Sequence, residues 1–338
     1  MVAGVQASEN SASSDGPRPV NLRTDLGQLA DLIEISFANA MDNRGRAAVQ
    51  EMRTFARMGP GLSLLSALNQ MGMGQGHVWI ANGRIVGNVT VYPASERGFD
   101  GKTWVFVNVA THPNFQRRGI AEHLMHASMD MIRARGAHTA YLQVDADNMV
   151  ARRLYNRLGF VEERGFITWR RSGLYHKPAP SNSGIHIAHR RADEWRAEYE
   201  LAQMVRPQLL GGLGWLRPLT LAEFRRTPWQ HLRDWLSFRS VERLVIRSED
   251  GKRLLAALWI ENMLMNSSAS LTLLVHPDYE GVYDEALLNT AVRRFGSAPL
   301  NIEHPADREA TNTILRRYQF GPRMDVIQMR WDVKAARS

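Results

Sequence analysis

The sequence contains no cysteine among its 338 residues. Without thiols, the chain cannot form disulfides, a thiolate metal site or a covalent intermediate on cysteine. The 11 histidines form no HExxH or comparable cluster, so we expect no metal cofactor. A cysteine-free composition suits a reducing compartment, and we therefore expect a cytoplasmic protein.

Long apolar runs are also missing. No stretch approaches the roughly 18 apolar residues that a membrane-spanning helix needs. Residues 1–19 are mostly small and polar, and they lack the basic start and apolar run of a signal peptide. We expect a disordered leader there and no membrane partner.

Lysine is scarce: only four of the 42 Lys and Arg residues are lysines, and the others are arginines. The net charge of +8 favours acidic partners such as nucleotides, phosphorylated cofactors or nucleic acid. The charge is spread over both halves of the chain, however, and neither a lysine-rich tract nor a nucleic-acid motif is present. We therefore expect no nucleic acid among the partners.

The length of 338 residues favours two domains, because a domain typically has about 150 residues. Residues 20–176 and 185–338 each carry strand and helix patterns, and residues 177–184 have the composition of a linker. We expect two tandem domains of the α/β class, each a mostly antiparallel twisted sheet flanked by helices.

Local patterns predict the elements of the first domain. Asn82-Gly83 between two apolar runs predicts a hairpin. Thr24 is the expected cap of the first helix. We expect strands over 77–81, 84–92, 103–111, 139–144 and 160–171, and helices over 46–58, 119–135 and 148–158.

The second half repeats the first. Residues 112–115, His-Pro-Asn-Phe, superpose on 276–279, His-Pro-Asp-Tyr, at an offset of 164. Residues 154–160 superpose on 314–320 at an offset of 160. Two matches in the same order and context predict a duplicated domain.

The two copies differ at polar positions. Gly119 becomes Tyr283 and Tyr155 becomes Leu315, while an arginine stands opposite Asn148. The second copy keeps the apolar pattern of its helices and loses the polar residues. We therefore expect a degenerate second domain.

The turn before the long helix of the first domain can hold an anion. A strand that leads through a loop into a helix aims backbone N–H groups at one point, where the helix N-terminus adds positive charge. Gly119 lets the backbone approach a bulky anion, and Arg117 and Arg118 add formal charge. These features predict a diphosphate cradle, although an ordinary strand-to-helix turn with two exposed arginines would carry them too.

The larger pattern resembles a known family. Residues 107–124, VNVATHPNFQRRGIAEHL, are similar to the acetyl-CoA-binding motif of the GNAT acetyltransferase superfamily. Residues 148–160, NMVARRLYNRLGF, resemble the second signature of that family, Asn-x-x-Ala-x-x-Leu-Tyr-x-x-x-Gly-Phe. The resemblance is close over residues 20–171 and weaker over residues 185–333.

The resemblance implies a role for each matched residue. Backbone groups of Val109, Ala110 and Thr111 would hold the pantetheine arm of acetyl-CoA and polarise the thioester carbonyl. Asn148 would contact the end of that arm, and Tyr155 would protonate the departing thiolate. The pyrophosphate would lie against the segment made of Gln116, Arg117, Arg118, Gly119, Ile120, Ala121 and Glu122, in which alanine stands at position 121 where glycine is commonest.

The implied function is an acetyl-CoA-dependent N-acetyltransferase, an acyltransferase that moves an acetyl group to a primary amine by direct attack. A regulatory or sensor protein that binds acyl-CoA without turnover is the alternative. The acceptor would be a small-molecule or peptide amine, and a homodimer is compatible with the sequence. The general base stays open between Asp145, Glu96, His112 and a chain of waters.

Overall fold

The computed structural model describes residues 15–333 except 39–40, 42, 59–74, 95–98, 100–101, 176–177, 181–183, 226–238, 264–267 and 296. The chain divides into two compact units. The first comprises residues 1–95, 100–142 and 331–338, and the second comprises residues 96–99 and 143–330. Among the described residues, no helix is both long and apolar enough to cross a membrane.

The first unit holds a sheet in the order β1-β2-β3-β4-β5, antiparallel except for the parallel pair β4–β5. Its strands are β1 (Gly16–Pro19), β2 (Gly76–Ala81), β3 (Arg84–Pro93), β4 (Thr103–Thr111) and the first part of β5 (Thr139–Asp145). Its helices are α1 (Leu22–Phe37), α2 (Asn43–Met58) and α4 (Ile120–Ala134), and a short 3-10 turn, η2 (Pro113–Phe115), precedes α4.

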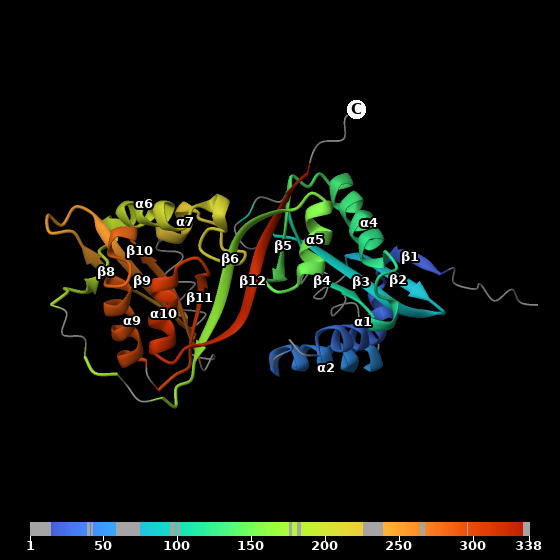
Figure 1. Ribbon diagram of the computed structural model, residues 1–338, viewed down its shortest axis with the longest axis horizontal. Helices are drawn as coiled ribbons and strands as arrows, with labels where there is room; N and C mark the ends of the chain where they lie inside the picture. Colours follow the sequence, from blue (N-terminus) through green and yellow to red (C-terminus); the bar gives the residue numbers. More distant parts are fainter. Residues whose placement is uncertain are drawn as a thin grey trace, which may run out of the picture. The chain divides into compact units, whose positions relative to one another are not determined.

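Helices cover both faces of this sheet (Figure 1). Successive strand residues point to opposite faces, so Val78 and Ile80 of β2 pack against α1 while Trp79 between them meets His123 of α4. Gly87 of β3 lets α4 approach closely, because a Cβ there would lie 2.6 Å from the Cγ2 of Ile120. The N-terminus of α4 is thereby fixed against the centre of the sheet.

The second unit holds strands in the order β12-β6-β11-β10-β9-β8-β7. The strands are β6 (Val161–Arg171), β7 (Ala188–His189), β8 (Arg239–Arg247), β9 (Leu254–Met263), β10 (Ala269–Val275), β11 (Leu300–Pro305) and β12 (Gly321–Asp332). The helices are α5 (Met149–Arg157), α6 (Trp195–Val205), α7 (Leu221–Phe224), α9 (Tyr283–Arg294) and α10 (Glu309–Arg317), with 3-10 turns η3 (Ala192–Glu194), η4 (Gln208–Leu210) and η5 (Pro277–Tyr279).

Two apolar cores lie on opposite faces of the second sheet. Leu258 and Ile260 of β9 pack with residues of α9 and α10. Ala257 and Trp259, which alternate with them, pack with residues of α6 and α7. Glu198 of α6 accepts a hydrogen bond from the indole N–H of Trp259, with 2.7 Å between the heavy atoms, and fixes this helix to the sheet.

The second unit takes strands from both halves of the chain. β6 lies between β11 and β12 and is antiparallel to both, with Trp169 opposite Ile302 and Phe166 opposite Val326. In the repeat, β6 and β12 are the matching last strands. The division of the units at residues 142 and 143 therefore differs from the expected boundary near 176, because β6 pairs with strands of the second half.

Two expectations for the start of the first unit are wrong. Gly16–Pro19 is not disordered: it forms the edge strand β1, because its backbone pairs with β2 from Gly16 opposite Ile80 to Pro19 opposite His77. The cap of α1 is Asn21 and not Thr24, because the Asn21 side chain accepts a hydrogen bond from the N–H of Arg23. The expected Met- and Gly-rich loop at 71–74 lies outside the described residues.

Candidate acyl-donor site

A β-bulge interrupts β4 at the residues expected to meet the thioester. Asn88 of β3 pairs with Ala110 and Thr90 pairs with Val107, so Asn108 and Val109 together stand opposite the single residue between Asn88 and Thr90. Asn108 has a positive φ of 52°. A bulge of this kind leaves backbone groups outside the ladder and turns them away from the neighbouring strand.

The other edge of β4 is also released from pairing at this point. The parallel ladder with β5 ends at Val105 opposite Tyr141, whereas β4 continues to Thr111. The backbone of residues 106–111 therefore lies beyond the ladder on this edge. Val109 and Thr111 are half-buried and Ala110 is buried, so this stretch offers partly enclosed backbone groups.

The turn after β4 has the same structure in both halves of the chain. The Nδ1 of His112 accepts a hydrogen bond from the N–H of Asn114 at 3.2 Å, and the Nδ1 of His276 accepts one from the N–H of Asp278 at 3.3 Å. Each histidine caps a 3-10 turn that begins with proline. The repeat read from the sequence is therefore a repeat of local structure.

The turn then presents the N-terminus of α4 to solvent. Arg117 and Gly119 both have positive φ, 61° and 75°, and no side chain caps the helix. Alternating conformations of this kind point successive N–H groups to one side, and the first N–H groups of a helix lack partners within it. Residues 116–119 are exposed, so these groups can meet a large anion.

Two side chains brace the same turn. Arg118 donates a hydrogen bond to the carbonyl of Asn114 at 3.2 Å and lies 5.0 Å from the centre of the Phe115 ring. Gln116 donates to the carbonyl of Thr111 at 3.4 Å. Ile120 is buried under the start of α4, while Ala121 and Glu122 are half-buried. The residues that the sequence selects between Val109 and Glu122 thus lie along one continuous segment, from the end of β4 through the turn to the start of α4.

The two remaining candidates, Asn148 and Tyr155, belong to the second unit. Asn148 caps α5: its Oδ1 accepts a hydrogen bond from the N–H of Ala151 at 3.1 Å. The Tyr155 side chain is buried, with its ring centre 6.0 Å from that of Phe160. Burial raises the pKa of Tyr155 and keeps the phenol protonated. Their roles at the donor stay predictions.

In the second copy, aromatic and acidic side chains occupy the matching turn at the start of α9. Tyr279 and Tyr283 stack, with ring centres 4.5 Å apart. Asp284, buried at the start of α9, accepts hydrogen bonds from the N–H of Glu285 at 3.0 Å and from the hydroxyl of Thr311 at 2.6 Å. A carboxylate of the chain therefore occupies a helix N-terminus where an external anion would otherwise bind.

The matching strand of the second copy also lacks the bulge. β10 pairs with β9 in unbroken register from Ala269 opposite Asn262 to Val275 opposite Ala256. Thr272, which matches Asn108, pairs with Trp259 inside that ladder. The bulge thus occurs in the first copy and not in the described ladder of the second, and the start of the matching helix in the second copy holds the buried carboxylate of Asp284.

The candidate general bases differ in their surroundings. The Nδ1 of His112 already holds the turn. Asp145 is exposed at the end of β5, and its backbone carbonyl accepts a hydrogen bond from the N–H of Asn148. Glu96 lies outside the described residues. Within the described chain, no group of three or more acidic or histidine side chains is arranged to hold a metal ion.

Sequence reasoning missed Asn88. This residue is only 1% exposed, and its side chain donates hydrogen bonds to the carbonyl of Asn108 at 2.8 Å and to the hydroxyl of Thr90 at 3.1 Å. A polar residue inside the apolar run of residues 85–91 was the available signal, because a buried amide needs partners. Asn88 holds the bulge from the neighbouring strand.

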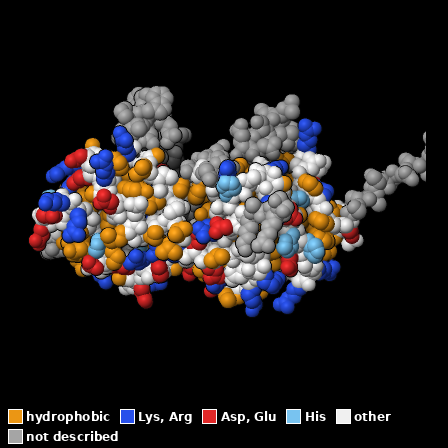
Figure 2. All heavy atoms as spheres, turned by 90° about the horizontal axis from the view of Figure 1, so that it is seen from above, with side chains coloured by type: hydrophobic (Ala, Val, Ile, Leu, Met, Phe, Trp, Pro, Cys, Tyr) orange, Lys and Arg blue, Asp and Glu red, His pale blue; other side chains and the backbone are white. Residues whose placement is uncertain are grey.

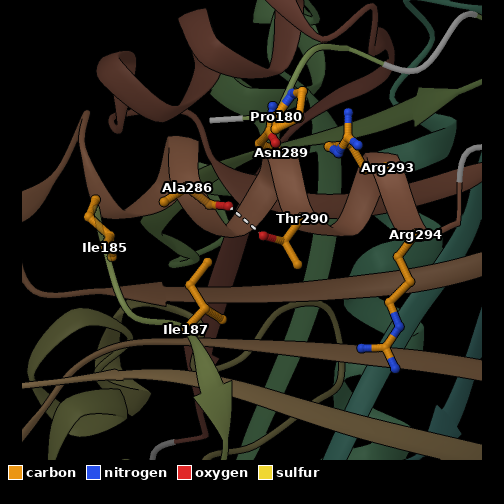
Figure 3. Close-up of a pocket in the computed structure, with 8 residues that line it drawn as sticks. All are labelled: Pro180, Ile185, Ile187, Ala286, Asn289, Thr290, Arg293 and Arg294. Atoms are coloured by element: carbon orange, nitrogen blue, oxygen red, sulfur yellow. Dashed lines mark hydrogen bonds between the residues drawn. The ribbon is translucent and has the colours of Figure 1, made fainter. Parts of the chain in front are cut away.

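A separate pocket lies in the second unit (Figure 3). It has a volume of about 380 Å³ and is lined by Pro180, Ile185, Ile187, Ala286, Asn289, Thr290, Arg293 and Arg294. Its polar side chains already have partners: Asn289 and Arg293 donate to linker carbonyls, and Thr290 donates to the carbonyl of Ala286. On the face seen in Figure 2, basic side chains are interspersed with acidic ones.

Comparison with known proteins gives a partial match to a family model and partial matches to curated relatives. Residues 49–160 match the model of the acetyltransferase (GNAT) family. A [ribosomal protein bS18]-alanine N-acetyltransferase of Salmonella typhimurium is 44% identical over 55 residues, and the one of Escherichia coli K12 is 40% identical over 55 residues. These matches cover 16% of this chain and span 37% of the length of the relatives.

The fold resembles a solved structure over nearly the whole chain. The GCN5-related N-acetyltransferase from Sphaerobacter thermophilus superposes with a TM-score of 0.59, covers 94% of this chain and 95% of its own, and is 17% identical. The expected α/β fold, with mostly antiparallel sheets flanked by helices, is confirmed. The match to the acetyltransferase (GNAT) family is thus confined to residues 49–160, and over the rest of the chain the likeness is one of fold.

Proposed function

We propose that this chain is an acetyl-CoA-dependent N-acetyltransferase in which the first copy of the repeat is active and the second is silent. One observation carries the proposal. The bulge at Asn108 is followed, after the end of β4 and the loop of residues 112–119, by the uncapped N-terminus of α4. The two features offer backbone donors of the kind that a thioester carbonyl and a pyrophosphate, the two polar groups of an acyl-CoA, would need.

The pyrophosphate would bind the segment 116–122. The first N–H groups of α4 and the alternating turn supply donors, and the helix N-terminus adds about half a positive charge. Arg117 is exposed and adds a formal charge. Arg118 is held by the turn carbonyl and the Phe115 ring, so it contributes rigidity as well as charge.

The thioester would lie along β4 beyond the end of its ladder with β5. The amine nitrogen attacks the carbonyl carbon, and negative charge develops on the carbonyl oxygen. A backbone N–H released by the bulge, which we assign to Val109, would stabilise that oxyanion. The C–S bond then breaks, and the thiolate takes a proton from the Tyr155 phenol while the attacking nitrogen loses one to Asp145 or to water.

The repeat supports the grouping of Asn148 with the β4 residues. In the second unit, Leu273, Val275, Glu280 and Arg308 line one cavity. They match Val109, Thr111, Gln116 and Asn148 of the first copy. Positions that serve one cavity in one copy are expected to serve one ligand in the other.

The acceptor is an amine on a small molecule or on a peptide. The bacterial relatives are named for acetylation of an alanine in a ribosomal protein, and the match to them covers 16% of this chain. We therefore place a peptide with an N-terminal alanine among the acceptors to be tested, beside polyamines and amino acids.

The test is release of CoA thiol during incubation with acetyl-CoA and a panel of amines. Because the chain contains no cysteine, a thiol-reactive chromogen gives no signal from the protein itself. We expect thiol release that depends on one class of amine, with a mass gain of one acetyl group on that amine. Parallel reactions without amine control for hydrolysis.

Calorimetry with CoA separates the proposal from its alternative. Binding of CoA without turnover for any amine would favour an acyl-CoA sensor. Absence of CoA binding would contradict both functions.

A further inference from the structure

A small cavity lies inside the second unit, where β10 and β11 diverge. Their ladder ends at Leu271 opposite Ile302, and the cavity of about 20 Å³ lies beyond that point. A cavity of this size holds one water molecule or one small ion. Its lining residues are Val205, Arg206, Leu273, Val275, Glu280, His304, Pro305, Arg308 and Thr311.

Two residues that line this cavity carry buried hydrogen-bond donors without a partner in the part of the chain that the structure describes. Arg206 is 2% exposed and His304 is 5% exposed. The Nη2 of Arg206 lies 3.1 Å from the Nδ1 of His304. A guanidinium only donates, so Nδ1 accepts and the ring proton lies on Nε2. Among the described residues, neither Arg206 Nη1 nor His304 Nε2 has a hydrogen-bond partner.

Within the described ranges, no carboxylate forms an ion pair with Arg206, because the neighbouring acidic side chains pair with other arginines. Arg308 pairs with Glu280 at 2.9 Å, and Arg164 pairs with Asp307 at 2.9 Å. Arg206 instead contacts a neutral imidazole, because burial and the nearby arginines lower the pKa of His304 well below its usual value.

The remaining nearby carboxylate belongs to Glu303. It accepts a hydrogen bond from the N–H of Trp215 at 3.0 Å, and burial raises its pKa. Burial lowers the pKa of Arg206 to about 9, which still leaves the guanidinium charged at neutral pH. A buried cation with free donors calls for an anionic neighbour.

We propose that this cavity binds a small monovalent anion of halide size between Arg206 Nη1 and His304 Nε2. The polar wall offers donors and the remaining wall is apolar, with Val205, Leu273 and Val275, which suits a weakly hydrated ion. The carboxylates of Glu303 and Asp307 act on the charge of Arg206 without a hydrogen bond to it. A water molecule could accept the same two hydrogen bonds, but only an anion would bring negative charge into contact with Arg206. The anion would tie the end of α6 to β11 in the copy that has lost the donor site.

The direct test is anomalous diffraction from crystals of the full chain soaked in sodium bromide. We expect a bromine peak within hydrogen-bonding distance of both nitrogens. In solution, chloride and bromide at constant ionic strength, with gluconate as the balancing anion, should raise the Tm. The expected rise is roughly 3–6 °C when the halide is tenfold above its Kd.

Two variants connect the effect to this cavity. Val275→Ile fills space in the cavity and keeps both donors, whereas Arg206→Met removes the cation. Both should abolish the bromine peak and the halide-dependent rise, and Arg294→Met, which removes an arginine elsewhere in the unit, should preserve them. If Arg206→Met fails to fold, Val275→Ile still decides.

Three outcomes would overturn the proposal. One is a water in the cavity with no bromine peak. Another is a peak without a halide-specific rise in Tm, which means binding at crystal concentration only. The third is a full halide effect in Val275→Ile.

Discussion

The side-chain amide of Asn88 donates a hydrogen bond to the backbone carbonyl of Asn108, with 2.8 Å between the two atoms. The bond joins β3 to β4 where β4 leaves its regular ladder and where φ of Asn108 is 52°. An asparagine in the left-handed region is strained by about 1 kcal/mol, and a buried partner can hold it there. Asn88 is therefore a positioning residue for the proposed oxyanion site.

Replacing Asn88 by alanine should slow acetyl transfer more than it weakens acetyl-CoA binding. The variant leaves the carbonyl of Asn108 without its partner, which should lower the free energy of unfolding by about 1–3 kcal/mol. Steady-state kinetics and urea unfolding measure the two effects. Thr90→Val removes the other hydrogen bond of Asn88 and is the control, with turnover retained. Normal kcat in Asn88→Ala would remove Asn88 from the proposed site.

Replacing Gly119 by alanine should weaken acetyl-CoA binding by roughly tenfold, which corresponds to about 1.4 kcal/mol. The new Cβ would lie 3.4 Å from the His123 ring, at the mouth of the proposed cradle, and the positive φ of 75° disfavours alanine. Gly136→Ala is a matched control, because φ there is 76° and nothing lies within 4 Å.

Calorimetry with CoA on the two glycine variants separates strain from binding. Both should lose about 1–2 kcal/mol of stability through backbone strain. Only Gly119→Ala should lose affinity. Equal affinities in the two variants would show that the turn does not hold the ligand.

Replacing Tyr155 by phenylalanine should lower kcat by about 10²–10⁴-fold and leave CoA affinity unchanged, as expected for loss of a general acid. Burial raises the pKa of Tyr155, so the phenol stays protonated above pH 10, the usual value for tyrosine. The pH profile of the native chain should therefore show no alkaline fall from this group below about pH 10. Kinetics from pH 6 to 10 test both statements.

The control for Tyr155 lies in the second copy. Burial also raises the pKa of Tyr318, and its hydroxyl lies 3.1 Å from the side-chain nitrogen of Asn289. Tyr318→Phe should leave turnover unchanged. Full activity in Tyr155→Phe would assign the Tyr155 ring to packing alone, beside Phe160.

One CoA should bind per chain. In the second copy, Asp284 takes the N–H of Glu285 and the hydroxyl of Thr311, so a pyrophosphate would meet a buried carboxylate instead of free donors. Isothermal titration with CoA measures the stoichiometry. Two equivalents of similar affinity would show that the second copy has kept a donor site.

The parts of the site that depend on neighbours along the chain could be predicted from the sequence. The hairpin at Asn82-Gly83, the turn at His112 and the start of α4 after Gly119 follow from local conformational preferences. The bulge could not be predicted, because it depends on Asn88, twenty residues away on another strand. The filled second site depends in the same way on Thr311 reaching back to Asp284.

The pairing of β6 could not be predicted either. Its apolar alternation is compatible with any neighbouring strand, and the choice of β11 depends on residues about 130 positions later. Domain boundaries drawn from composition therefore follow the duplicated sequence, whereas the compact units follow the strand pairing.

The position of β6 between β11 and β12 also determines when the second unit can form during synthesis. β6 ends at Arg171, but its partner β11 begins at Leu300. At ribosomal speeds of about 5–20 residues per second, β6 must wait on the order of 10 s for that partner. Both edges of β6 thus lack their native partners until the second half emerges, which exposes this strand to aggregation and to chaperone capture during that interval.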